Sequence, residues 1–91
     1  MNERATIIEL EEFLNWLTVE RGRAASTVSG YRRDVANFLE WLDSTDEHLL
    51  TAQERDITAY VAHLKHADRA PATVARATVA IRSFSRFLAA E

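Results

Sequence analysis

The chain has 91 residues, enough to close one modest hydrophobic core but too few for two, so it is expected to be a single domain spanning residues 1–91. Hydrophobic residues make up 47% and charged residues 27%, which excludes a disordered segment, while two glycines and one proline exclude a many-turned β-fold. The lack of cysteine excludes disulfide bonds and thiolate zinc sites, and a formal net charge of −3 taken alone counts against nucleic-acid binding.

The first two predicted helices span about residues 5–21 and 26–43. In the first, apolar side chains recur at steps of three and four, the spacing of one helix face: Ile7, Leu10, Phe13, Leu14 and Leu17. Gly22 ends this helix, and Ser26 is expected to be the N-cap of the next, because its hydroxyl can accept from free backbone N–H groups. The core face of the second helix consists of Val28, Tyr31, Val35, Phe38, Leu39 and Leu42.

A third helix follows a polar, aperiodic joint at residues 43–50. It begins either at Thr51, which can form a capping box with Glu54, or at Asp56. Its core face is defined by the helical spacing of Ile57, Tyr60, Val61 and Leu64.

The fourth predicted helix begins at Pro71, whose fixed φ suits a first turn, and ends near Ala90. Its core face consists of Val74, Ala77, Ile81, Phe84 and Leu88. Four amphipathic helices joined by short links must cover one another's apolar faces, so the predicted fold is all-α, a compact four-helix bundle.

The basic residues are concentrated in two windows of the sequence that contain no acid. Residues 21–33 hold four arginines and residues 69–90 hold four more, out of eleven lysines and arginines in all. The fourteen acidic residues lie outside these windows. The bundle is therefore expected to have a basic side, with acids absent where they would repel phosphate, and an acidic remainder.

Two of the predicted helices present arginines beside small hydroxyl residues. One side of the second helix holds Ser26, Ser29, Arg32 and Arg33. An arc of about 120° on the fourth helix holds Arg76, Arg82, Ser83 and Arg86. Guanidinium groups fork onto phosphate or guanine, and short hydroxyl side chains allow close approach and donate to phosphate. The pattern indicates nucleic-acid binding, with two merely solvated helix faces as the alternative.

The sequence contains no recognisable catalytic, metal or cofactor site. His63 and His66 share a helix face without a third ligand, so no metal is expected. Tyr31 and Tyr60 lie on core faces and are expected to be half-buried aromatics rather than nucleophiles. With two glycines no phosphate-binding loop can be built, and no cofactor is expected. Short apolar runs and the lack of a signal-peptide core favour a cytoplasmic protein without membrane association.

Four short motifs follow one another along the chain. They are T-x-x-x-Y-R-x-D at residues 27–34, F-L-x-W-L at 38–42, T-V-x-R at 73–76 and R-S-F-x-R-F-L at 82–88. This order resembles the N-terminal region of phage-integrase-like tyrosine recombinases, and the Xer recombinases most of all. The resemblance implies a SAM-like core-binding domain that closes on one side of DNA, while a C-terminal catalytic domain closes on the other. Because the catalytic tyrosine and its assistants belong to that absent second domain, the isolated chain is expected to be inert as an enzyme.

The resemblance also implies partners and the residues that contact them. The partners are double-stranded DNA, the catalytic domain of the parent recombinase, and other protomers in a tetrameric synapse on DNA. The implied DNA contacts on the second and fourth helices are Ser26, Thr27, Ser29, Arg32, Arg33, Thr73, Arg76, Arg82, Ser83 and Arg86. The alternative function is a helical protein–protein interaction domain without DNA binding, which uses Trp16 or Trp41 against a partner.

Overall fold

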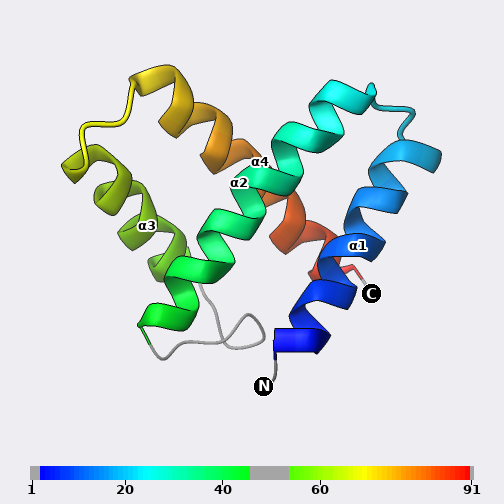
Figure 1. Ribbon diagram of the computed structural model, residues 1–91, viewed down its shortest axis with the longest axis horizontal. Helices are drawn as coiled ribbons and strands as arrows, with labels where there is room; N and C mark the ends of the chain where they lie inside the picture. Colours follow the sequence, from blue (N-terminus) through cyan, green and yellow to red (C-terminus); the bar gives the residue numbers. More distant parts are fainter. Residues whose placement is uncertain (1–2, 46–53, 91) are drawn as a thin grey trace.

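Four α-helices make up nearly all of the described chain. The computed structural model describes residues 3–45 and 54–90, with side chains from residue 8 onward. The helices are α1 (Glu3–Val19), α2 (Ala25–Ser44), α3 (Glu54–His66) and α4 (Pro71–Ala89), and the described residues include no strand (Figure 1). The Cα radius of gyration is 12.7 Å, close to the value of about 12 Å expected for a compact chain of this length. The predicted all-α, compact four-helix bundle is confirmed.

The central pair of helices is α2 and α4, which make the most extensive contact in the bundle. In Figure 1, α2 crosses the molecule diagonally in front of α4, and the two helices diverge on both sides of the crossing. The helix α1 packs against this pair on one side of the crossing, and α3 packs against it on the other side. Each of the two central helices therefore contacts all three other helices of the bundle.

The hydrophobic core is divided into two clusters, one for each outer helix. The first joins α1 to the central pair and consists of Leu10, Phe13, Leu14, Leu17, Val35, Ala80 and Phe84. The second joins α3 to the same pair and consists of Phe38, Leu42, Ile57, Tyr60, Leu64, Val74, Ala77 and Ile81. Full burial of a large apolar side chain contributes about 1.5–3 kcal/mol, so both clusters contribute substantially to stability.

The core faces expected from the sequence are confirmed. Every predicted core residue with a described side chain is buried or partly buried, and the partly buried ones are Val28, Tyr31, Leu39, Val61 and Leu88. The aromatic rings of Phe13 and Phe84 meet at the centre of the first cluster with their centroids 5.2 Å apart. The side chain of Ile7 lies outside the described residues.

The starts and ends of the helices differ in part from those predicted. The N-cap of α2 is Ala24, whose extended backbone lets its carbonyl accept from the Val28 N–H, so the assignment of Ser26 as N-cap was wrong. Ser26 lies inside the first turn. The predicted start of α4 at Pro71 is confirmed, while α1 ends two residues earlier than predicted, at Val19.

The start of α3 is the least well predicted of the four. The described helix begins at Glu54, so Asp56 is not its first residue but a nearly buried one inside the first turn. The alternative start at Thr51 lies outside the described residues. Glu54 and Asp56 in the first turn are favourably placed toward the positive end of the helix dipole.

Candidate nucleic-acid interface

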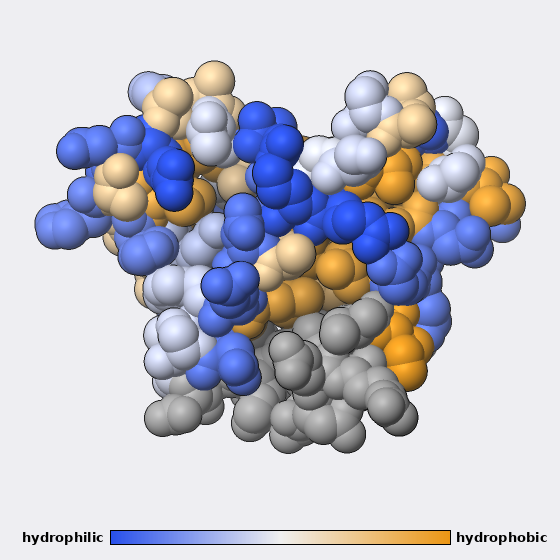
Figure 2. Space-filling model, viewed as in Figure 1, coloured by the Kyte–Doolittle hydropathy of each residue, from blue (hydrophilic) through white to orange (hydrophobic). Residues whose placement is uncertain are grey.

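The residues predicted to contact DNA are accessible, and five of them line two different pockets. All five on α2 are exposed: Ser26, Thr27, Ser29, Arg32 and Arg33. On α4, the exposed ones are Arg76 and Arg86, and the partly buried ones are Thr73, Arg82 and Ser83. Figure 2 shows a band of hydrophilic residues across the centre of the molecule, where α2 lies in front. Their neighbours in space divide the predicted residues into separate groups.

The first group gathers where α2 and α4 meet, in a pocket of about 530 Å³ that α3 also lines. Arg33 comes from α2, and Thr73 and Arg76 come from the N-terminal half of α4. Arg69, in the link before α4, lines the same pocket and was not among the predicted residues. We call this the α2–α3–α4 pocket; it brings together basic and hydroxyl groups that are about 40 residues apart in the sequence, and the carboxylates of Asp34 and Glu40 also line it.

The buried carboxylate of Asp34 pairs with two arginines of this pocket, Arg33 and Arg76. The side chain of Asp34 is only 5% exposed. Arg76 donates two hydrogen bonds to it, from Nε to Oδ2 at 3.0 Å and from Nη2 to Oδ1 at 3.2 Å. Nε of Arg33 lies 3.8 Å from Oδ1. The hydrogen bonds to Asp34 raise the pKa of Arg76, and the pairing fixes the plane of a guanidinium whose outer edge remains exposed.

Asp34 was missed as a functional residue, although the sequence contained a signal for it. It directly precedes Val35 on the core side of α2, where a charged residue needs a partner. It also ends the first of the four motifs, with Tyr31 and Arg32. A charge at an apolar position of that kind points to a buried ion pair.

Two other predicted arginines form ion pairs with acids of the outer helices. Arg32 makes a two-pronged pair with Glu11 of α1, and the hydrogen bonding lowers the pKa of Glu11 and raises that of Arg32. Arg82 pairs with Glu54 at the start of α3. The expectation that acids are absent beside the predicted arginines is therefore wrong for these two and for Arg33 and Arg76, which lie beside Asp34. Apart from Asp34 beside Arg33, the acids are remote in sequence but are brought alongside by helix packing.

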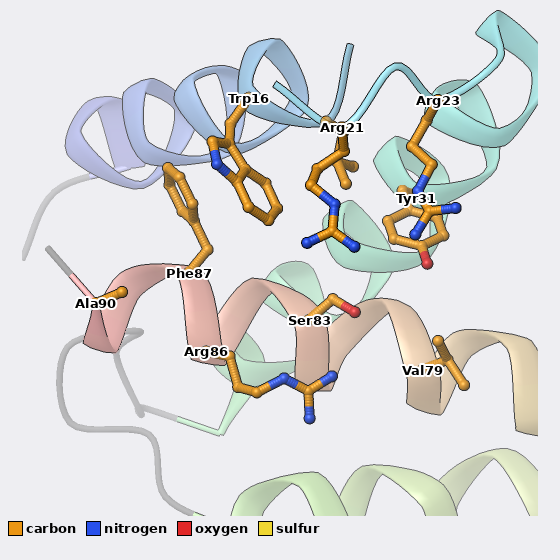
Figure 3. Close-up of a pocket in the computed structure, with 10 residues that line it drawn as sticks. Trp16, Arg21, Arg23, Tyr31, Val79, Ser83, Arg86, Phe87 and Ala90 are labelled. Atoms are coloured by element: carbon orange, nitrogen blue, oxygen red, sulfur yellow. The ribbon is translucent and has the colours of Figure 1, made fainter. Parts of the chain in front are cut away.

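The last group lies in a second pocket. Ser83 and Arg86 line it from α4, together with Arg21 and Arg23 from the link between α1 and α2 (Figure 3). We call it the α1–α2–α4 pocket. The structure therefore separates Ser83 and Arg86 from Thr73 and Arg76, although all four belong to one helix.

The two tryptophans, considered as partner-binding residues, pack within the chain. Trp16 stacks near Phe13 and Phe87, with ring centroids 6.2 Å and 5.4 Å away. Trp41 lies against Tyr60, with a centroid distance of 5.3 Å, and His63 packs beside both rings. Burial and the nearby Asp34 charge raise the pKa of Tyr60. Both tryptophans are partly buried.

Neither metal-binding clusters nor membrane spans are found in the part of the chain that the structure describes. No three histidine, cysteine, aspartate or glutamate side chains there are grouped to hold an ion. None of the described helices has the length and apolar character needed to cross a bilayer.

Known proteins with similar sequences are tyrosine recombinases. A family model described as "Phage integrase, N-terminal SAM-like domain" matches residues 10–91. Tyrosine recombinase XerD of Agrobacterium fabrum is 40% identical over 82 residues, which cover 90% of this chain and 25% of that protein. Tyrosine recombinase XerC of Herpetosiphon aurantiacus is 37% identical over 81 residues, which cover 88% of this chain and 26% of that protein.

These matches extend over most of the bundle. The family model includes α2, α3 and α4 completely and leaves out only the first nine residues. The chain spans about a quarter of the length of the curated relatives it matches, and no solved structure gives a significant match. Family match, relatives and four-helix fold agree, and the chain belongs to the family of phage integrase N-terminal SAM-like domains.

Proposed function

We propose that this chain is a DNA-binding domain of a tyrosine recombinase and grips duplex DNA through α2 and α4. The observation that carries the proposal is the convergence of Arg33, Thr73 and Arg76 in the α2–α3–α4 pocket. They come from two helices and are joined there by Arg69. Arginine forks and a small hydroxyl group are the donors that contact phosphate oxygens and guanine edges.

Pre-positioning by Asp34 supports this function. A free arginine side chain loses about 1.5–2 kcal/mol of conformational entropy when it is fixed in a complex. The two hydrogen bonds to Asp34 fix Arg76 before any ligand arrives. The part of the guanidinium that faces solvent then meets a phosphate with less loss of freedom.

The ion pairs of Arg32 and Arg82 predict that the isolated domain has only a modest affinity for DNA. Each of these arginines must exchange a carboxylate for a phosphate, in a chain with a net charge of −3. If about four to six phosphates are neutralised, log K falls against log salt with a slope of about −3.6 to −5.4. Binding is therefore expected to be strong only at low ionic strength.

The remaining expectations from the family form part of the same proposal. Residues 1–91 are one domain, and strand cleavage and rejoining belong to a C-terminal catalytic domain of the parent protein. That domain and further protomers in a tetramer on DNA are the proposed partners, in the cytoplasm.

The proposal is tested by fluorescence anisotropy with a labelled duplex of about 16 base pairs, at about 50 mM and about 200 mM salt. The Arg33→Gln variant is expected to lose roughly 2- to 5-fold in affinity and about 0.9 in salt slope. Arg55→Gln is the matched control, because Arg55 is exposed on α3 and lines neither pocket. Equal affinities for the folded Arg33→Gln and control variants would refute the proposed interface and direct attention to a protein partner.

A further inference from the structure

Three arginines converge on the α1–α2–α4 pocket, which has a volume of about 560 Å³. Figure 3 shows the guanidinium group of Arg21 in the space between α1 and α4, while the side chain of Arg86 runs along α4 at the edge of the pocket. Arg23 and Tyr31 close the side nearest α2, and the hydroxyl of Ser83 faces the same space from α4. The pocket therefore presents hydrogen-bond donors from three directions.

The link between α1 and α2 is folded so that it holds Arg21 and Arg23 at the pocket. Gly22 lies between them with φ of +60°, a conformation that disfavours any residue with a Cβ. The backbone N–H of Arg23 donates to the carbonyl of Leu17 at 3.0 Å, which closes the turn. The guanidinium of Arg21 lies over the Trp16 ring, 5.6 Å from its centroid.

The charge of this pocket is not compensated within the described part of the chain. No carboxylate lines it, and none of Arg21, Arg23 and Arg86 has an ion pair with residues 8–45 or 54–90. Arg32 and Arg82, by contrast, are already paired with acids. A cluster of like charges without counter-charges favours an anionic ligand.

We propose that the α1–α2–α4 pocket binds a phosphate group of the DNA backbone, with Arg21 and Arg23 as contacts outside the two helices. The inference rests on the proposed function and adds a second anchor to it. Ser83 lies seven residues after Arg76 and so on nearly the same side of α4, about 10.5 Å further along its axis. That is the rise of about three base pairs of duplex DNA. One duplex can therefore reach both pockets.

The donors of the pocket suit a phosphodiester better than a carboxylate. Guanidinium forks and the hydroxyls of Ser83 and Tyr31 supply more donors than one carboxylate can use. The volume also exceeds that of a single small ion and leaves room for the sugar attached to the phosphate. Trp16 and Phe87 offer apolar contacts to that sugar.

The test is an NMR titration of the ¹⁵N-labelled 91-residue chain that follows the arginine Nε–Hε signals. A 16-base-pair duplex is expected to shift the signals of Arg21, Arg23 and Arg86 at low salt. Shifts confined to Arg33 and Arg76 would overturn the second anchor and leave the proposed function intact. A titration that moves no arginine signal would refute both.

Two further ligands test whether the pocket prefers the phosphates of DNA to other anions. Inorganic phosphate and a glutamate-rich peptide are each added at the same concentration of anionic groups as the duplex, and each is expected to give much smaller shifts of Arg21 and Arg23. Shifts as large as those caused by the duplex would overturn the proposal, in favour of a free phosphate ligand in the first case and an acidic protein segment in the second.

Substitution of Arg23 tests its proposed contact with DNA without disturbing the fold of the pocket. Arg23→Gln leaves the stacking of Arg21 on Trp16 in place and is expected to lower duplex affinity by roughly 2- to 5-fold, with a salt slope reduced by about 0.9. Arg55→Gln is again the control, and circular dichroism verifies the fold of both. An Arg23→Gln variant that is folded and binds like the control would overturn the contact.

Discussion

Replacing Glu11 by Gln is expected to strengthen DNA binding, because this carboxylate competes with phosphate for Arg32. Glu11 makes two contacts with the guanidinium, and both side chains are 51% exposed. Exposed ion pairs are worth about 0.2–1 kcal/mol. If Arg32 must leave Glu11 before it can contact DNA, the Glu11→Gln variant no longer loses that free energy when it binds. The affinity for DNA is then expected to rise by about 1.4- to 5-fold.

The assay is fluorescence anisotropy with one duplex at several salt concentrations. Glu12→Gln is the matched control, since Glu12 is the exposed neighbour on α1 and its substitution changes the net charge equally. A general charge effect raises affinity in both variants alike, whereas release of Arg32 raises it in Glu11→Gln alone. Equal affinities for the two variants, or weaker binding by Glu11→Gln, would refute the reasoning that Arg32 exchanges a carboxylate for phosphate.

Three further predictions concern stability and are measured by urea or thermal unfolding. Because pairing with Arg32 lowers the pKa of Glu11 from its usual 4.5, the stabilisation by this pair is present at neutral pH and is lost as pH falls through the lowered pKa of Glu11. The difference in Tm between wild type and Glu11→Gln should therefore shrink as the solution is acidified below pH 4.5, and a difference that stays constant would contradict the pairing. Asp34→Asn should lower the free energy of unfolding by about 1.5–3 kcal/mol, through weaker hydrogen bonds to a charged partner, and a neutral effect would contradict a structural ion pair. Phe84→Ala should cost about 3–5 kcal/mol, whereas the exposed Val79 should tolerate Ala within about 0.5 kcal/mol; similar losses at both positions would contradict the assigned core.

The helices and their core faces were predictable because they depend on local spacing. The core face of α1 follows the helical period and consists of Leu10, Phe13, Leu14 and Leu17. In a single small domain, such a face can be buried only in the interior. The N-cap of α2 was not predictable in the same way. Ser26 has the right side chain, but Ala24 has the extended backbone at which the helix begins.

The arrangement of the charges could be predicted only in part. Windows free of acids were visible in the sequence, yet Glu11 and Arg32 are 21 residues apart, and Asp34 and Arg76 are 42 apart. Such pairs depend on how helices cross, which periodicity does not specify. For the same reason, the sequence did not predict that Arg21 and Arg23 share a pocket with Arg86, because this depends on the packing of α1 beside α4.

The division of the core between the two outer helices bears on how the bundle opens. Each cluster is a separate set of contacts, and only α2 and α4 contribute to both. Amide hydrogens in the middle of these two helices should therefore exchange most slowly, since either outer helix can loosen while the other still covers them. Local opening of α3 would loosen the α2–α3–α4 pocket and leave Arg21, Arg23 and Arg86 in place. If DNA binds at both pockets as proposed, this division of the core would let the domain release DNA in steps, one pocket at a time.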